Sequence, residues 1–229
     1  HARGALLAQS PVPGMALVSG SRALNGRAHP GVLHACLKAC QAYAPSMESI
    51  RALPMPERLF VPLQQHVGAA ATAIVAVGDK VFKGQLIASN QGPISAPVHA
   101  PTSGRIVALG DYPAPHPSGL PVPTLTLEAD GEDRWQAADI PDDPFALAAE
   151  DIAARVAAAG IVGLGGAAFP SAVKLNISRK SGVDTLIVNG GECEPYLTCD
   201  DRLMCERAEG VVAGIRLIHR AVGSRQVLV

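Results

Sequence analysis

Residues 161–202 read IVGLGGAAFPSAVKLNISRKSGVDTLIVNGGECEPYLTCDDR, and this stretch decides the fold of the C-terminal part of the chain. It opens with a glycine-rich loop that contains Gly163, Gly165 and Gly166. Glycine allows backbone N–H groups to approach an anion without a Cβ in the way. Pro170 then suits the first position of a helix, whose unpaired N–H groups and dipole favour phosphate. The stretch therefore predicts an α/β unit with a candidate phosphate site.

The loop alone leaves two interpretations open. Lys174, one turn into the predicted helix, adds a charge that suits a phosphate ligand. The alternative is a tight connection between two helices, in which glycine serves packing only. Residues 153–159 predict a helix before the loop, whereas the dinucleotide-binding fingerprint follows a strand. No Gly-Lys-Ser/Thr ends the loop, which excludes a Walker motif.

A predicted strand and two carboxylates follow the helix. Residues 184–188 (DTLIV) form a β-branched apolar run that predicts a buried strand, and Asn189 begins a turn at its end. Open α/β sheets bind ligands at this end of their strands. Glu192 and Glu194 point the same way if the chain stays extended. They suit an acid–base pair, contacts to ribose or a carboxamide, or simple solvation.

The motifs GLGGAAFPSAVKL and LIVNGGECEPYLTCDDRLM resemble the C subunit of the Rnf electron transport complex, a membrane-bound ferredoxin:NAD oxidoreductase. They are more distantly similar to the FMN- and NADH-binding subunit of respiratory complex I. The resemblance implies that both motifs enclose FMN and the nicotinamide of NADH. Glu194 is the implied catalytic residue, with a positioning role and no proton transfer. The implied cofactor-binding residues are Gly163, Gly165, Gly166, Ala167, Phe169, Lys174, Asn189, Glu192 and Glu194.

Two positions depart from this pattern. Ala168 stands where the family usually has a third loop glycine, which narrows the approach of a ligand. Gly191 stands where the complex I relatives carry an acidic residue, which removes one possible flavin contact.

Residues 54–130 predict a β domain. The run IVAVGDKVFKGQLIASNQGPISAPVHAPTSGRIVAL contains short apolar strands separated by glycine turns, and it is similar to biotinyl/lipoyl-type barrel-sandwich hybrids. Carrier domains of that fold present a lysine at a hairpin tip, and residues 89–97 contain none. His66 and His99 suit either a local structural hydrogen bond or a functional role.

The flanking segments give weaker signals. Residues 1–53 predict a poorly ordered leader with a short helix. Four residues cluster in it and suit a metal site or, more simply, a packed helix with two thiols. They are His29, His34, Cys36 and Cys40.

Beyond the β domain, residues 111–143 are rich in proline and acid and predict an irregular connection with a short strand at 123–128, of which 131–143 is the linker proper. Residues 144–229 predict the N-terminal part of the FMN/NADH-binding domain. Its predicted elements are a helix from Pro144, capped by Asp143 and closed by Gly160, a helix over 201–221 and a strand over 226–229.

Composition excludes some classes of function. A net charge of −1 and 3% aromatic residues argue against a nucleic-acid-binding surface. No apolar run is long enough to span a bilayer, so we expect membrane attachment only through partners. An odd number of cysteines, five, and no secretory signal predict reduced thiols in the cytoplasm. The spacing of Cys193, Cys199 and Cys205 matches no iron–sulfur motif.

The sequence thus predicts an α/β protein, with a barrel-sandwich-hybrid β domain and an incomplete Rossmann-like FMN/NADH-binding domain. The resemblance implies electron transfer between NAD(H) and ferredoxin through FMN, coupled to ion translocation. It implies the other Rnf subunits as partners, a peripheral place on the cytoplasmic face of the inner membrane, and 4Fe-4S clusters beyond Val229. A docking protein without cofactor and a soluble flavoprotein reductase of the cobalamin-reductase type are the alternatives.

Overall fold

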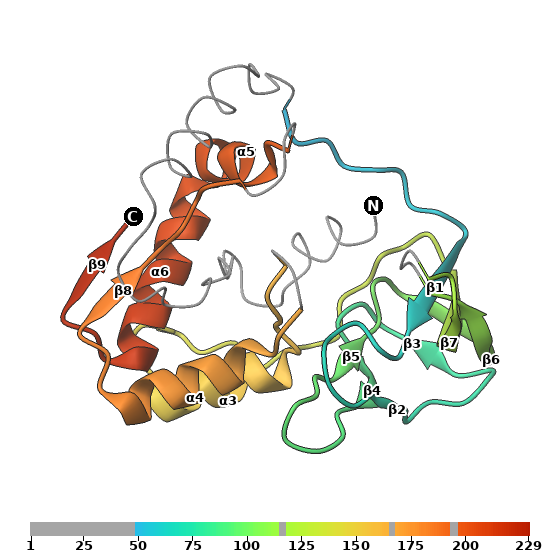
Figure 1. Cartoon of the computed structure of the whole chain (residues 1–229). Coiled ribbons are helices and arrows are strands. Elements are labelled where there is room, and N and C mark those ends of the chain that lie inside the picture. The colour runs from blue at the N-terminus through green and yellow to red at the C-terminus, as the bar shows by residue number, and fades with distance from the viewer. Residues whose placement is uncertain (1–48, 115–117, 165–167, 193–196) are drawn as a thin grey trace.

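The computed structural model describes residues 49–114, 118–164, 168–192 and 197–229. Two sheets form a β domain at one end of the molecule, and helices with a pair of short strands form the other end (Figure 1). The strands of the β domain are β1 (Arg58–Pro62), β2 (Thr72–Ala73), β3 (Lys80–Val81), β4 (Leu86–Ser89), β5 (Val98–His99), β6 (Gly104–Pro113) and β7 (Pro121–Ala129).

The β domain packs two antiparallel sheets around one core. The first has the strand order β1-β7-β6-β3 and the second the order β2-β4-β5. Alternating apolar residues of these strands point inward, as the period of two in a half-buried strand requires. Ile87, Ile106, Leu125 and Leu127 are fully buried in the resulting core. This arrangement agrees with the predicted barrel-sandwich hybrid.

The strand predicted over residues 123–128 is confirmed as part of β7, but the irregular connection predicted before it was wrong. Strand β6 continues to Pro113, and β7 lies in the middle of the four-stranded sheet, paired with both β1 and β6. The alternation of Leu125 and Leu127, buried, with Thr126, half-buried, gives β7 its inward face. Proline density therefore misled the prediction, because Pro121 and Pro123 lie at the far end of the strand from the core.

The segment after β7 is fastened to the β domain by buried polar groups. The Lys83 Nζ atom lies 2.6 Å from the Asp133 Oδ2 atom and 4.8 Å from the centroid of the Trp135 ring. Thr102, fully buried, donates its hydroxyl to Asp133 Oδ1 at 2.8 Å. Asp133 itself has a φ of 49°, a left-handed conformation that aspartate tolerates better than most residues. The segment that follows β7, residues 130–136, is thus held against the β domain, and we call it the strap.

Asp130 makes the strap sensitive to acid. Hydrogen bonds from the Ser103 hydroxyl, from the Glu132 N–H group and from the Arg134 side chain lower the pKa of its carboxyl to about 2. A carboxyl with a lowered pKa stabilises the fold above its unfolded pKa, and this contribution is lost as the pH falls through the folded value.

We therefore expect the Asp130→Asn variant to lose less stability than the parent between about pH 4 and pH 2, the window set by the unfolded and folded pKa values. Urea unfolding at several pH values measures this difference. Glu128→Gln is the control, since Glu128 is an exposed acid on the same strand end. Parallel curves for the parent and Asp130→Asn would contradict the assignment.

The helical part has its own core. Its elements are α3 (Ala149–Ala158), α4 (Ser171–Ser181), β8 (Thr185–Ile187), α5 (Cys199–Glu206), α6 (Ala208–Val222) and β9 (Gln226–Leu228). Helices α3, α4 and α6 pack together through Val156, Leu175 and Leu217 (Figure 1). Strands β8 and β9 pair in parallel, with Thr185 opposite Gln226. The predicted strands 184–188 and 226–229 are thus found, each slightly shorter than predicted, although only Val188 of the first run is buried.

Helix α3 begins later than predicted. Residues 144–148 form turns, and Asp143 accepts the Phe145 N–H group at 2.8 Å, so it caps a turn and not the helix. The Arg220 side chain donates to the carbonyl oxygens of Ala146 and Leu147. Those carbonyls would otherwise accept helical hydrogen bonds, which explains why the helix starts only at Ala149. Gly160 follows its end with a φ of 64°, in agreement with the predicted stop.

The single helix predicted over residues 201–221 is two helices. Arg207, with a φ of −131°, separates α5 from α6. None of the residues of α5 is buried, whereas α6 buries Val211, Leu217 and Ala221 against its neighbours. The two helices thus pack differently, because α6 buries one face and α5 buries no residue, and the chain bends between them.

Other predictions fall outside what the structure describes or concern the membrane. The predicted leader helix and the four clustered histidines and cysteines lie outside the described residues. Residues 49–57, which follow, contain no helix or strand and are exposed. Among the described helices, none has both the length and the apolar character needed to cross a bilayer.

The two parts of the molecule meet at a close contact. A Cβ on Gly160 would lie 2.4 Å from the Pro97 carbonyl oxygen, so the end of α3 touches the β domain directly. His99 of β5 lies beside it. Burial lowers the pKa of His99, and a hydrogen bond to the Ala158 backbone opposes part of that effect.

Candidate functional site

The glycine-rich loop is closed at its base by backbone hydrogen bonds. Val162 and Pro170 form an antiparallel bridge. Gly163 donates its N–H group to the Phe169 carbonyl oxygen at 2.9 Å, and Ser171 donates to the Ile161 oxygen at 2.9 Å. The loop therefore leaves and re-enters the fold at one point, directly before α4.

Ala168, the first described residue on the returning side of the loop, has a φ of 49°. This left-handed conformation favours glycine, because a Cβ crowds the following carbonyl. It is also the position at which the resemblance noted in the sequence implies a glycine. The Ala168 carbonyl oxygen accepts a hydrogen bond from the Val67 N–H group of the β domain at 3.4 Å. The β domain thus contacts the loop directly.

The N-terminus of α4 is the candidate site for an anionic ligand. Pro170 is its N-cap, so the helix begins at Ser171, one residue later than predicted, and no side chain caps it. The first N–H groups of a helix have no intrahelical partner. Lys174 is half-buried, and its Nζ atom lies 5.8 Å from the centroid of the Phe169 ring. A phosphate at this terminus would meet N–H groups and a nearby positive charge.

The residues after β8 form a second cluster. The Asn189 side-chain oxygen accepts the Gly191 N–H group at 3.0 Å, which fixes the turn. One Glu192 oxygen, Oε1, accepts the backbone N–H groups of Asp200 at 2.6 Å and Asp201 at 3.1 Å. Glu192 therefore caps α5 from a distance, a role that its sequence position did not predict.

Two further titratable groups lie close to the Glu192 carboxylate. Burial raises the pKa of the Asp200 carboxyl, and the neighbouring Glu192 charge adds to the effect. Burial and the Glu192 charge also raise the pKa of the Cys199 thiol, which donates to Glu192 Oε2 at 3.6 Å. Ligand atoms of these three residues lie within 4.8 Å of one another. Cys199 is exposed, and its raised pKa disfavours the thiolate that would bind a metal.

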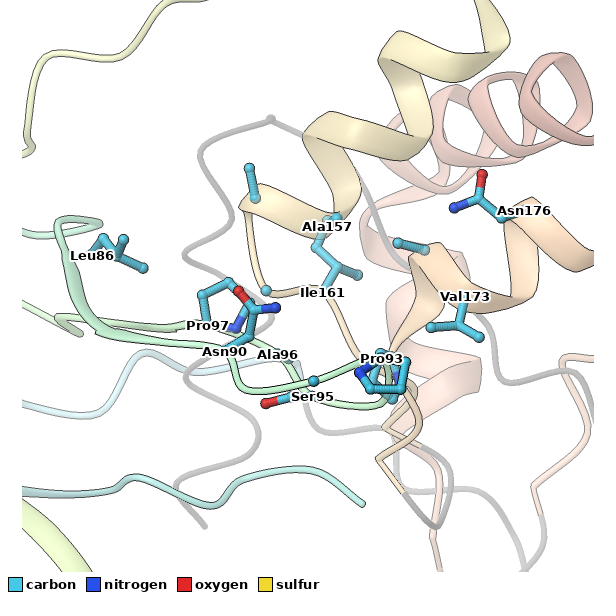
Figure 2. A pocket seen from close by; sticks show the side chains of 15 residues that line it. Leu86, Asn90, Pro93, Ser95, Ala96, Pro97, Ala157, Ile161, Val173 and Asn176 are labelled. Atoms are coloured by element: carbon cyan, nitrogen blue, oxygen red, sulfur yellow. The ribbon is translucent and has the colours of Figure 1, made fainter. Parts of the chain in front are cut away.

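A pocket lies between the two parts of the molecule (Figure 2). It encloses about 370 Å³ between the β4–β5 hairpin and the facing ends of α3 and α4. Its walls are mainly apolar, with Pro97 and Ile161 among them, and the side chains of Asn90 and Asn176 are polar parts of the lining. None of the described residues that line it is charged. The hairpin that carries a lysine in carrier domains here forms one wall of an interdomain pocket.

The structure places the predicted site residues in two groups. Gly163, Phe169 and Lys174 surround the base of the glycine-rich loop, and Asn189 and Glu192 follow β8. Within the described part of the chain, no side-chain hydrogen bond of Asn189 or Glu192 reaches the first group. Four predicted residues lie outside the described residues, and their placement stays a prediction. They are Gly165, Gly166, Ala167 and Glu194.

His66, for which the sequence allowed two interpretations, has a local hydrogen-bonded place in the structure. Its ring is 7% exposed and lies between backbone groups of Val67 and Ala96. What the sequence did not reveal is that Val67, the next residue, contacts the glycine-rich loop. The only sequence feature at this position is the run PLQQHVG, in which glycine and histidine follow a strand, and it does not predict a contact with the loop.

Comparison with known families defines the class of protein. Residues 37–132 match the RnfC barrel sandwich hybrid domain, and residues 156–229 match the Nuo51 FMN-binding domain. The chain thus joins a barrel-sandwich hybrid to an FMN-binding α/β domain, as the sequence predicted.

Relatives narrow the class to one family. The C subunit of the ion-translocating oxidoreductase complex of Rhodobacter capsulatus is 59% identical over 180 residues, which are 79% of this chain and 35% of the relative. The Pseudomonas aeruginosa protein of the same name is 45% identical over 202 residues, or 88% of this chain and 26% of the relative. The chain belongs to the family of these C subunits. It spans about a third or less of the length of the curated relatives that it matches.

Proposed function

We propose that this chain belongs to a protein that passes electrons between NAD(H) and ferredoxin through FMN and 4Fe-4S clusters, in a complex that couples this transfer to ion translocation. The match of residues 156–229 to the Nuo51 FMN-binding domain carries the proposal. The names of the relatives support the coupling to ion movement. The clusters would be bound outside residues 1–229, since the cysteines present match no cluster motif.

The described residues fit a flavin phosphate at α4. The helix has no side-chain cap. The Ser171 N–H group already donates to the Ile161 carbonyl oxygen, so an anion would be bound by the N–H groups that follow it in the first turn. The base of the loop, held by the hydrogen bond between Gly163 and Phe169, lies directly before this terminus. Lys174, one turn further on, supplies the charge. We assign Gly165, Gly166 and Ala167 to the same phosphate-facing backbone.

The second group of residues would contact the rings. The Asn189 oxygen is already bonded to Gly191, which leaves the exposed Asn189 amide group to donate to a ring carbonyl. A carboxylate has about four acceptor sites, so Glu192 can accept a ring N–H group while it caps α5. Glu194 would orient the nicotinamide carboxamide. When bound, FMN supplies the ability to take up a hydride and release single electrons.

The proposed function implies a cellular location and partners for the chain. We propose a peripheral place at the cytoplasmic face of the inner membrane, held by the other members of the complex, with ferredoxin as the electron partner. The names of the relatives, as parts of a multi-subunit complex, support partner subunits.

The Lys174→Gln variant is expected to bind FMN about tenfold more weakly, because a charge-assisted hydrogen bond to phosphate contributes roughly 1.5 kcal/mol or more. Quenching of FMN fluorescence by the full-length protein measures the affinity. Lys180→Gln is the matched control, since Lys180 is exposed near the other end of α4.

The loss should shrink at high salt and should be absent for riboflavin, which lacks the phosphate. Equal affinities of the Lys174 and Lys180 variants for FMN would contradict the assignment of the phosphate to α4. A folded parent that binds no FMN would favour a docking protein without cofactor.

A further inference from the structure

A buried histidine joins two loops of the β domain. The His66 Nδ1 atom lies 3.1 Å from the Val67 carbonyl oxygen, and its Nε2 atom lies 3.0 Å from both the nitrogen and the carbonyl oxygen of Ala96. A neutral ring with the proton on Nδ1 donates to the Val67 oxygen and accepts the Ala96 N–H group. The ring therefore fixes the peptide of Val67 relative to the β4–β5 hairpin.

The surrounding contacts make this unit rigid. Gly68 has a φ of 101°, and a Cβ there would lie 2.1 Å from the Ile94 carbonyl oxygen. Ala69 donates its N–H group to the same oxygen at 3.0 Å, and its own carbonyl oxygen accepts the Ser95 hydroxyl at 2.8 Å. The loop that carries Val67 is thus held to the hairpin at His66 and at the two residues after Val67.

The exposed edge of this unit touches the glycine-rich loop. The Val67 N–H group donates to the Ala168 carbonyl oxygen at 3.4 Å. Ala168 holds a left-handed conformation that is unfavourable for a non-glycine residue. Phe169, the next residue, closes the base of the loop by accepting the Gly163 N–H group. An outside contact therefore holds the strained residue on the returning side of the loop.

We infer that His66 is a positioning residue of the cofactor site, which acts through the Val67 backbone to hold Ala168 in the conformation that α4 and the loop need for binding. This inference rests on the proposed function, because the site concerned is the FMN phosphate site. It gives the β domain a role in cofactor binding that requires no carrier lysine. His66 itself lies behind the loop and needs no contact with the ligand.

The first test replaces the ring. His66→Phe in the full-length protein keeps a planar side chain but removes both hydrogen bonds, and we expect FMN to bind about tenfold more weakly, the factor that corresponds to the left-handed strain of one residue. His66→Gln keeps an acceptor for Ala96 and should lose less. His219→Phe is the matched control, since His219 makes a comparable local bond to Ser224 at 2.7 Å in α6.

The second test uses Ala168. Ala168→Gly relieves the left-handed strain, so we expect it to restore FMN affinity in the His66→Phe background while it changes the parent much less. If His66 only stabilised the β domain, a substitution in the other domain would not restore FMN affinity. A His66→Phe protein that is folded and binds FMN as tightly as His219→Phe would overturn the inference.

A measurement on the parent covers the case in which His66→Phe does not fold. Amide hydrogen exchange should show the Val67 N–H group exchanging at least about tenfold more slowly after FMN is added, because the ligand stabilises the loop that accepts its hydrogen bond. Unchanged exchange at Val67 in a protein saturated with FMN would overturn the inference. A parent that binds no FMN at all would remove the proposed function first, and the positioning role with it.

Discussion

The Asp133→Ala variant is expected to lose about 3 kcal/mol of unfolding free energy, because Lys83 would remain buried without its partner. The Lys83 side chain is only 10% exposed, and its Nζ atom lies 2.6 Å from the Asp133 carboxylate. Thr102, fully buried, would also lose its acceptor. Urea unfolding followed by Trp135 fluorescence measures the loss, since this ring lies against Lys83.

The control is the double variant Lys83→Met, Asp133→Ala, which removes both charges and should recover much of the loss. Glu132→Ala is the surface comparison, because Glu132 is exposed and pairs with Arg134, and such surface pairs contribute about 1 kcal/mol or less. If Asp133→Ala proves no more destabilised than Glu132→Ala, the strap is not held by this buried pair.

The Gly160→Ala variant is expected to lose about 3 kcal/mol, from left-handed strain of about 1 to 2 kcal/mol and a steric clash of similar size. The added Cβ would lie 2.4 Å from the Pro97 carbonyl oxygen, so the two parts of the molecule must move apart. We therefore expect the variant to expose the interdomain pocket to proteolysis at residues that the parent protects.

Gly182→Ala separates the two effects. Gly182 ends α4 with a φ of 65°, nearly the value of Gly160, but a Cβ there would meet nothing within 4 Å. We expect Gly182→Ala to lose only the unfolding free energy that corresponds to the left-handed strain, and to keep the protease resistance of the parent. Equal behaviour of the two variants in both assays would show that the close contact at Gly160 does not hold the domains together.

The sequence predicted the elements whose signals are local. Glycine turns and alternating apolar residues identified the β domain, and the run DTLIV identified β8. The start of α3 could not be predicted in this way, because it depends on Arg220, more than 70 residues later in the chain, which takes the carbonyls that a longer helix would use. The bend at Arg207 likewise results from the packing of α6 and not from a helix-breaking residue.

The candidate site also combines features that local sequence predicts with features that depend on distant parts of the chain. The placing of Gly163 and Lys174 near the start of α4 was predictable from local sequence signals, and their role in cofactor binding stays a prediction. The capping of α5 by Glu192 depends on where the chain returns after the turn, and the contact between Val67 and Ala168 joins residues from different domains. Ala168 is visible in the sequence as a departure from the family motif, but only the backbone shows that it has the left-handed conformation that glycine favours.

The most direct test of the proposed function is the visible absorption spectrum of the full-length protein, reconstituted with FMN and freed of excess, before and after anaerobic addition of NADH. We predict retained flavin bands that NADH bleaches in the parent, and bands that are retained but bleached far more slowly in Glu194→Gln. Flavin that NADH does not reduce in the folded parent, or equal bleaching of the parent and Glu194→Gln, would contradict the proposed passage of electrons from NADH at this site.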